Sequence, residues 1–168
     1  MNILIVTGIF PPDHGGPASY VPMIADSLEK KGHRIIGVVT LSDELNANDF
    51  SFNYPVIRIL RSLNKLVRFF KVVQSIYRLS RNSDVIYLNG LVMEGIVATK
   101  ILSSKPVAVK VVGDLIWEKF RNYTNNIIEL DNFQIADLPL KWKLLRFLQS
   151  WYTSQADIII TPSKYLAS

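Results

Sequence analysis

Short apolar segments alternate with segments of helical spacing along the chain, and this order constrains the fold more than any other feature of the sequence. The apolar segments are bounded by polar residues or glycine, as buried strands are, and lie at 3–7, 35–40, 56–60, 84–88, 106–112 and 157–161. Between them, apolar residues recur every three or four positions and predict helices at 19–31, 63–81, 92–102 and 139–153. This order predicts an α/β fold: a Rossmann-like, doubly wound parallel sheet with helices on both faces.

Composition narrows the class of protein further. A chain of 168 residues, 49% of them hydrophobic, can bury the core of one domain and is not typical of a disordered protein. Cysteine is absent, which favours a reducing cytosol, and two distant histidines (His14 and His33) without cysteine argue against a metal site. Lys110 interrupts the most apolar run, and no basic leader precedes the first strand, so we expect neither a membrane span nor a signal peptide.

The loop after the first strand ends in two adjacent glycines, Gly15 and Gly16. In a parallel sheet this loop lies at the carboxyl edge, where ligands bind. Glycine lets a ligand approach the backbone, and the helix that begins near Pro17 presents free N–H groups and a partial positive charge. These features favour phosphate binding, with a purely structural turn as the alternative. Neither a dinucleotide-binding fingerprint nor a P-loop is present.

Three further polar side chains are expected near the same edge. His14 lies inside the glycine loop, and Tyr20 lies near the start of the helix that follows it. Asn89 ends the strand at 84–88, where its amide can either hydrogen-bond a polyhydroxylated ligand or cap the next helix. Capping is the favoured interpretation of Asn89.

A carboxylate follows the strand at 106–112. Gly113 and Asp114 end this strand, and Trp117 and Glu118 follow closely. A carboxylate there can orient a hydroxyl group or act as a base. It can equally cap a short helix at 115–120, and the spacing alone does not separate the two roles.

The net charge of +5 is concentrated between residues 50 and 83, a segment without any acidic residue. Its cations are Arg58, Arg61, Lys65, Arg68, Lys71, Arg78 and Arg81. This excess predicts an anionic partner. Within the helix at 63–81, Lys65, Arg68 and Lys71 lie largely outside the apolar stripe, as expected of a membrane-surface helix or of an ordinary solvated face. A nucleic-acid partner is disfavoured, because no recognition-helix motif is present.

Four segments follow one another in a characteristic order. They are residues 10–16 (FPPDHGG), 28–40, 109–114 (VKVVGD) with Trp117-Glu118, and 156–166 (ADIIITPSKYL). Together they resemble the N-terminal half of a family 4 glycosyltransferase of GT-B fold, over essentially the whole chain. The resemblance implies an enzyme that transfers a sugar, with retention, from a nucleotide-sugar donor to a lipid-linked or polysaccharide acceptor in cell-envelope glycan synthesis. It implies a metal-independent hexosyltransferase without a cofactor, in which the nucleotide sugar is a co-substrate.

The resemblance also implies roles for individual residues. Gly15 and Gly16 would bind the donor phosphates through backbone N–H groups, and Asp114 would assist catalysis. The expected acceptor- or substrate-binding residues are His14, Tyr20, Asn89, Gly113, Trp117 and Glu118, although many relatives carry histidine at the position of Gly113.

On the same resemblance, residues 1–168 form the N-terminal Rossmann-like domain, one half of a GT-B architecture, without the C-terminal donor-binding domain. A helix is predicted to begin at Pro162 and Ser163, and one turn of helix is not stable alone, so we expect a longer protein. The fragment alone is expected to be inactive, and the enzyme to be cytoplasmic and peripheral at the inner face of the membrane. The alternative function is a non-catalytic membrane-associated or carbohydrate-binding α/β module.

Overall fold

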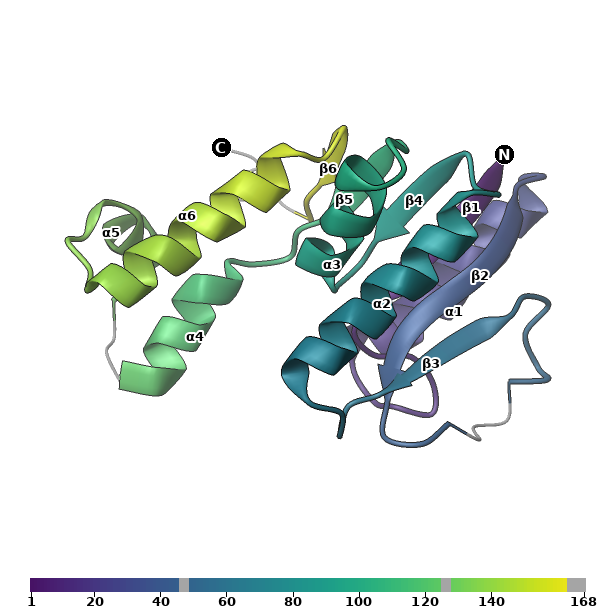
Figure 1. Cartoon of the computed structure of the whole chain (residues 1–168), viewed down its shortest axis with the longest axis horizontal. Helices are drawn as coiled ribbons and strands as arrows, with labels where there is room; N and C mark the ends of the chain where they lie inside the picture. The colour runs from purple at the N-terminus through teal and green to yellow at the C-terminus, as the bar shows by residue number, and fades with distance from the viewer. Residues whose placement is uncertain (46–48, 125–127, 163–168) are drawn as a thin grey trace.

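A six-stranded, fully parallel sheet in the order β3-β2-β1-β4-β5-β6 organises the chain (Figure 1). The structure is a computed structural model that describes residues 1–45, 49–124 and 128–162. The strands are β1 (Asn2–Thr7), β2 (Arg34–Ser42), β3 (Val56–Leu60), β4 (Val85–Leu88), β5 (Val107–Lys110) and β6 (Ile158–Ile160). The helices are α1 (Gly16–Lys30), α2 (Lys65–Ser80), α3 (Val92–Ile96), the π-helical turn η1 (Val97–Ile101), α4 (Leu115–Thr124), α5 (Leu130–Ile135) and α6 (Leu140–Ser154).

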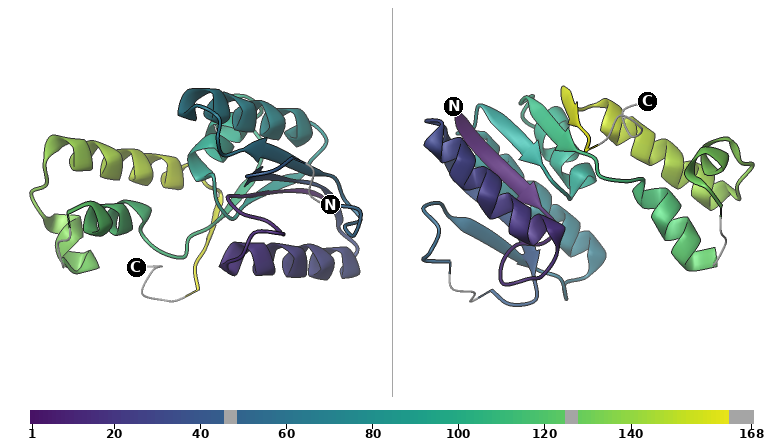
Figure 2. Two further views of the ribbon diagram at one scale, coloured as in Figure 1. Left: turned by 90° about the horizontal axis from the view of Figure 1, so that it is seen from below. Right: turned by 180° about the vertical axis from the view of Figure 1, so that it is seen from behind.

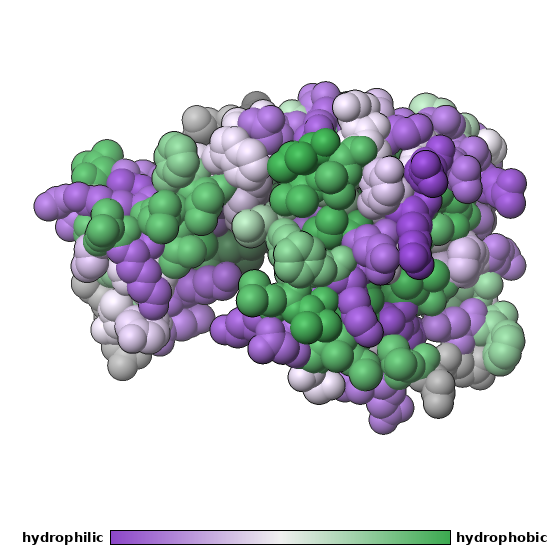
Figure 3. Space-filling model, in the orientation of Figure 1, coloured by the Kyte–Doolittle hydropathy of each residue, from purple (hydrophilic) through white to green (hydrophobic). Residues whose placement is uncertain are grey.

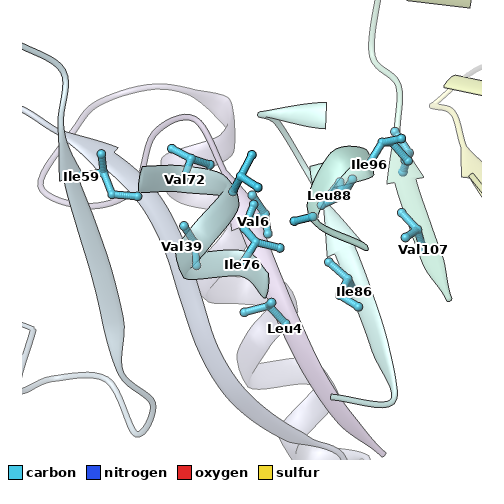
Figure 4. Packing of buried hydrophobic residues seen from close by; sticks show 13 residues of the cluster. Leu4, Val6, Val39, Ile59, Val72, Ile76, Ile86, Leu88, Ile96 and Val107 are labelled. Atoms are coloured by element: carbon cyan, nitrogen blue, oxygen red, sulfur yellow. The ribbon is translucent and has the colours of Figure 1, made fainter. Parts of the chain in front are cut away.

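Both faces of the sheet are covered because successive strand residues point to opposite sides. In β1, Ile3 and Ile5 belong to the core beneath α1, whereas Leu4 and Val6 belong to the core beneath α2 and α3. Figure 2 shows α1 on one side of the sheet and α2 on the other, and Figure 4 shows Ile76 of α2 packed among the residues of the second core. The predicted doubly wound parallel sheet is therefore confirmed.

The winding of the chain reverses at β1. Strands β2 and β3 lie on one side of β1, and β4, β5 and β6 lie on the other. The connections that follow β1 and β4 therefore lead to opposite faces, and ligands of doubly wound sheets bind in the crevice at such a point. The two backbones meet closely there: a Cβ atom added to Gly90 would lie 2.7 Å from the Gly8 nitrogen.

Helices α4, α5 and α6 form a third, smaller core beside the sheet (Figure 1). Its buried side chains are Ile116, Phe120, Phe133, Leu138 and Trp142. The short helix expected at 115–120 extends to Thr124, and α5 lies where no helix was predicted. Burial of Phe120 against Phe133 and Trp142 explains the additional helical structure, because isolated short helices gain most of their stability from tertiary packing.

The other differences from the expected elements are local. The helix predicted at 92–102 is divided into α3 and η1. The helix predicted to begin at Pro162 and Ser163 lies outside the described residues from Ser163 onward. In the described part of the chain, every helix is too short or too polar to cross a lipid bilayer.

Candidate functional site

The first turn of α1 faces the carboxyl edge of the sheet without a protein group to cap it. Gly15 precedes the helix, no side chain caps the start of α1, and its first turn contains no acidic residue. Gly15 has a φ of 142°, a conformation that favours glycine, and a Cβ atom added at Gly16 would meet only open space. His14, Gly15 and Gly16 are all exposed. The N–H groups of a first helical turn have no partner within the helix, so this end of α1 is suited to an anionic ligand.

Two arginines of the β3 region hold the glycine loop in place. The buried Arg58 donates to the Pro11 carbonyl at 2.6 Å and forms a two-pronged ion pair with Asp49 at 2.6 and 2.9 Å. Arg61 forms an ion pair with Asp13. The hydrogen bond from this guanidinium is the main reason why the pKa of the Asp13 carboxyl lies below its usual value, and its positive charge lowers that pKa further. The two arginines thus have acidic partners inside the protein and are not available to an external anion.

Asn89 carries the least satisfied polar group of the site. Its side-chain nitrogen Nδ2 is buried and has no hydrogen-bond partner among the described residues, while its backbone nitrogen donates to Val6 of β1 at 2.8 Å. The prediction that Asn89 caps the next helix is wrong, because Leu91, in a left-handed conformation, occupies the N-cap position of α3. A buried donor without an acceptor is costly, so its presence at a sheet edge favours a ligand as the missing acceptor.

Two cavities adjoin at the ends of β4 and β5, with volumes of about 440 and 110 Å³. Residues that line both cavities are Val111, Gly113, Gln149 and Thr153. The smaller cavity adds Asn89 and Lys110, and the larger adds Asp114 and Arg146. The structure thus brings together three of the predicted site residues, Asn89, Gly113 and Asp114, and adds groups from α6.

Asp114 has the geometry of a helix cap. Its Oδ1 accepts hydrogen bonds from the backbone nitrogens of Ile116 and Trp117, both at 2.9 Å, and its Oδ2 accepts from Gln134 at 2.7 Å. The capping interpretation is therefore confirmed. A carboxylate oxygen has more than one acceptor site, so Asp114 can still accept a hydrogen bond from a ligand in the larger cavity. Its catalytic role stays a prediction.

Lys110 is a cation at this edge that sequence reasoning did not assign to the site. Its Nζ lies 3.2 Å from the centre of the Tyr20 ring, an arrangement that holds the ammonium group by a cation–π interaction. The Tyr20 hydroxyl accepts a hydrogen bond from the Tyr87 hydroxyl at 3.4 Å, and burial, together with this bond, raises the pKa of Tyr87. The available signal was the cation itself, since Lys110 interrupts an otherwise apolar strand.

Other predicted residues lie apart from the cavities. Trp117 packs against the small core, where its Nε1 donates to the Ile128 carbonyl at 2.8 Å. The exposed Glu118 reaches toward Gly113: a Cβ atom added to Gly113 would lie 2.8 Å from its Oε1. Lys65 and Lys71 lie on α2, on one face of the sheet.

Neither Trp117 nor Glu118 lines either cavity in the part of the chain that the structure describes. Their predicted substrate contacts stay predictions. Within the same residues, His, Asp and Glu side chains form no group of three or more that can hold a metal ion.

Comparison with known proteins identifies the fold of this chain but does not assign it to a family. No protein-family model and no curated protein matches the sequence. Two solved structures match 98% of this chain: a protein described as a UDP-N-acetylglucosamine 2-epimerase from Listeria monocytogenes (TM-score 0.62, 18% identity) and the UDP-GlcNAc 2-epimerase from Methanocaldococcus jannaschii (TM-score 0.59, 16% identity). The likeness is one of fold. This chain has the Rossmann-like architecture of a GT-B-like domain, and it spans only 39% and 40% of those two proteins.

This comparison corrects the predicted enzyme class. The assignment as a metal-independent hexosyltransferase is wrong, because the two solved structures named above are described as epimerases of a nucleotide sugar and not as glycosyltransferases. The resemblance to family 4 glycosyltransferases is supported only at the level of the GT-B-like fold. The four motif segments therefore reflect a shared architecture, which hosts more than one chemistry.

Proposed function

We propose that this chain is one lobe of a two-lobe enzyme that binds a nucleotide sugar at the carboxyl edge of its sheet. The observation that carries the proposal is the buried Nδ2 of Asn89, a donor without a described acceptor, at the point where the winding of the sheet reverses. The names of the two solved structures reported above support this ligand class, since each is described as a UDP-N-acetylglucosamine 2-epimerase. The share of those proteins that this chain spans supports a second lobe.

In this proposal, different groups at the carboxyl edge bind different parts of the nucleotide sugar. The uncapped first turn of α1, at Gly15 and Gly16, binds the diphosphate through N–H groups and the partial positive charge of the helix. Asn89 donates to a sugar or phosphate oxygen, and Lys110, whose Nζ lies over the Tyr20 ring, adds a positive charge on the α1 side of the edge. Asp114 and other polar residues of the larger cavity accept hydrogen bonds from sugar hydroxyls.

Epimerisation of the sugar is the candidate reaction. Both solved structures named above bear that name, and an epimerisation changes a carbon of the sugar itself without transfer to an acceptor. The lipid-linked or glycan acceptor predicted from the sequence has no part in this reaction and stays an untested prediction. The proposal for this chain is thus a binding role, with the chemistry completed by the second lobe.

Calorimetric titration of the 168-residue chain with UDP-N-acetylglucosamine tests the proposal. We expect saturable binding, which Asn89→Ala weakens at least tenfold because it removes the donor. Asn82→Ala is the matched control, since Asn82 lies in the turn before β4, at the opposite edge of the sheet. Equal affinities of these two variants, or no binding of UDP-N-acetylglucosamine to the wild-type chain, would contradict the proposal.

A further inference from the structure

Two helices on one face of the molecule carry only positive charge. Helices α2 and α6 lie toward the same side of the sheet, opposite α1, as the left view of Figure 2 shows. Neither α2 nor α6 contains an acidic residue, whereas α1 contains Asp26 and Glu29. The cations are Lys65, Arg68, Lys71 and Arg78 on α2 and Lys141, Lys143 and Arg146 on α6. The face formed by α2, η1 and α6 is called the cationic face below.

The same face exposes large apolar side chains. Phe70 on α2 and Phe147 on α6 are each 66% exposed. Further exposed apolar residues are Leu66 and Val67 on α2, Ile101 and Leu102 at η1, and Leu140, Leu144 and Trp151 on α6. Figure 3 shows apolar side chains gathered over these helices. Large exposed apolar patches are uncommon on soluble monomers, so the apolar side chains on these helices suit the face to contact with a partner.

The apolar residues of α6 form a stripe of helical spacing at positions 140, 144, 147 and 151. Gln149 and Thr153, which line the cavities, project from the other side of the same helix. On α2, a groove of about 540 Å³ continues the apolar surface between Phe70, Tyr77 and Leu102. The apolar stripe of α6 therefore faces away from the proposed nucleotide-sugar site, and Arg146 alone among the cations of α2 and α6 also lines a cavity of that site.

The combination of positive charge and exposed apolar side chains is typical of surfaces that bind anionic membranes. We infer that the cationic face docks on a membrane surface that carries anionic phospholipids. The phosphate groups of the lipids meet exposed lysines such as Lys65 and Lys71, while Phe70 and Phe147 enter the boundary between headgroups and acyl chains. A second copy of the chain fits this face less well, because a symmetric dimer would oppose the same cations to one another.

The structure refines the three basic residues predicted from the sequence. Arg68 donates to the Arg61 carbonyl at 2.6 Å, so part of its guanidinium already serves the fold. On α6, Arg146 donates to the Phe133 and Gln134 carbonyls, and Lys143 forms an ion pair with Asp137 at 2.5 Å. Lys65 and Lys71 are exposed on α2, and they are the cations that we expect to contact the lipid phosphates.

Sedimentation of the full 168-residue chain with lipid vesicles tests this inference. We expect the wild-type chain to bind vesicles of phosphatidylcholine with 30% phosphatidylglycerol, and pure phosphatidylcholine at least tenfold more weakly, because anionic headgroups attract the lysines. Lys65→Glu/Lys71→Glu should lower the partition coefficient on the anionic vesicles at least tenfold. Phe70→Ser/Phe147→Ser, which leaves the charge unchanged, should also lower it at least tenfold.

The matched control is Lys31→Glu/Arg34→Glu, which changes the net charge equally at exposed positions beyond the end of α1 and at the start of β2. This variant should bind almost as tightly as the wild type. Far-ultraviolet circular dichroism checks that every variant is folded. The inference is overturned if the wild type does not bind anionic vesicles, if the control loses as much as the α2 variant, or if the phenylalanine variant binds normally. Dimerisation through this face, without vesicle binding, would equally overturn it.

Discussion

The unpaired amide of Asn89 predicts an unusual sign for the effect of a mutation on stability. A buried donor without an acceptor costs about 1–3 kcal/mol. Asn89→Leu removes the donor at similar volume, so we expect the free energy of unfolding of the ligand-free chain to rise by about 1 kcal/mol. For a domain of this size, the melting temperature should rise by about 2–4 °C. Urea and thermal unfolding followed by circular dichroism measure both quantities.

Asn64 offers the matched comparison. Its side-chain oxygen accepts a hydrogen bond from the Leu66 nitrogen at 2.9 Å and caps α2. Asn64→Ala should therefore lower the free energy of unfolding by about 1 kcal/mol, the usual cost of losing such a cap. The reasoning about Asn89 is refuted if Asn89→Leu lowers stability as Asn64→Ala does, because the amide would then contribute a bond to the fold.

A ligand adds a second readout. Saturating UDP-N-acetylglucosamine should raise the melting temperature of the wild type, because a ligand that binds only the folded state stabilises it. The same concentration should have much less effect on Asn89→Leu, which has lost the donor. A variant that is more stable alone and less stabilised by ligand shows that Asn89 is retained for binding at a cost in stability.

Two further predictions concern the loop at the carboxyl edge. Gly90→Ala should lower the free energy of unfolding by about 1–3 kcal/mol, since the new Cβ would lie 2.7 Å from the backbone nitrogen of Gly8. Gly16→Ala is the control, because its new Cβ would meet open space and should leave the free energy of unfolding unchanged. Urea unfolding of both variants tests this difference. Arg61 lowers the pKa of Asp13 from its ordinary value of 3.8, so the stabilisation from this pair is present above about pH 4 and is lost as the pH falls through the lowered pKa. Asp13→Asn should therefore lose less stability than the wild type between pH 5 and pH 2, as measured by urea unfolding; equal losses would mean that the pair does not contribute.

The elements and the layers of the fold were predictable because their signals are local. Apolar segments such as 3–7 and helical spacing such as that of 63–81 depend on neighbouring residues only, and both appear as expected in β1 and α2. The helix α5 was missed, because burial of Phe133 depends on Phe120 and Trp142, which belong to the helices before and after it. Local composition does not reveal such packing.

The candidate site was predictable in position but not in detail. Asn89, Gly113 and Asp114 follow strands, and parallel strands bring their carboxyl ends to one edge. The left-handed conformation of Leu91 excludes Asn89 from the helix cap, and no sequence pattern indicates it. Likewise, Arg58 and Arg61 counted toward an external anion, although Asp49 and Asp13 neutralise them in the folded chain.

The enzyme class could not be obtained from short motifs. The segments at 10–16 and 109–114 shape the edge of a Rossmann-like sheet, and that edge can serve different reactions. Reaction chemistry depends on the groups placed around the substrate, and in the proposed two-lobe enzyme the second lobe supplies part of them.

Chemical-shift mapping of the isotope-labelled chain tests the central claim most directly. Titration with UDP-N-acetylglucosamine should shift the side-chain amide signals of Asn89 and the backbone amide signals of Gly15 and Gly16 along one saturable curve. Shifts confined to the opposite edge of the sheet, or an Asn89 amide that does not respond while other signals saturate, would contradict a nucleotide-sugar site at the carboxyl edge.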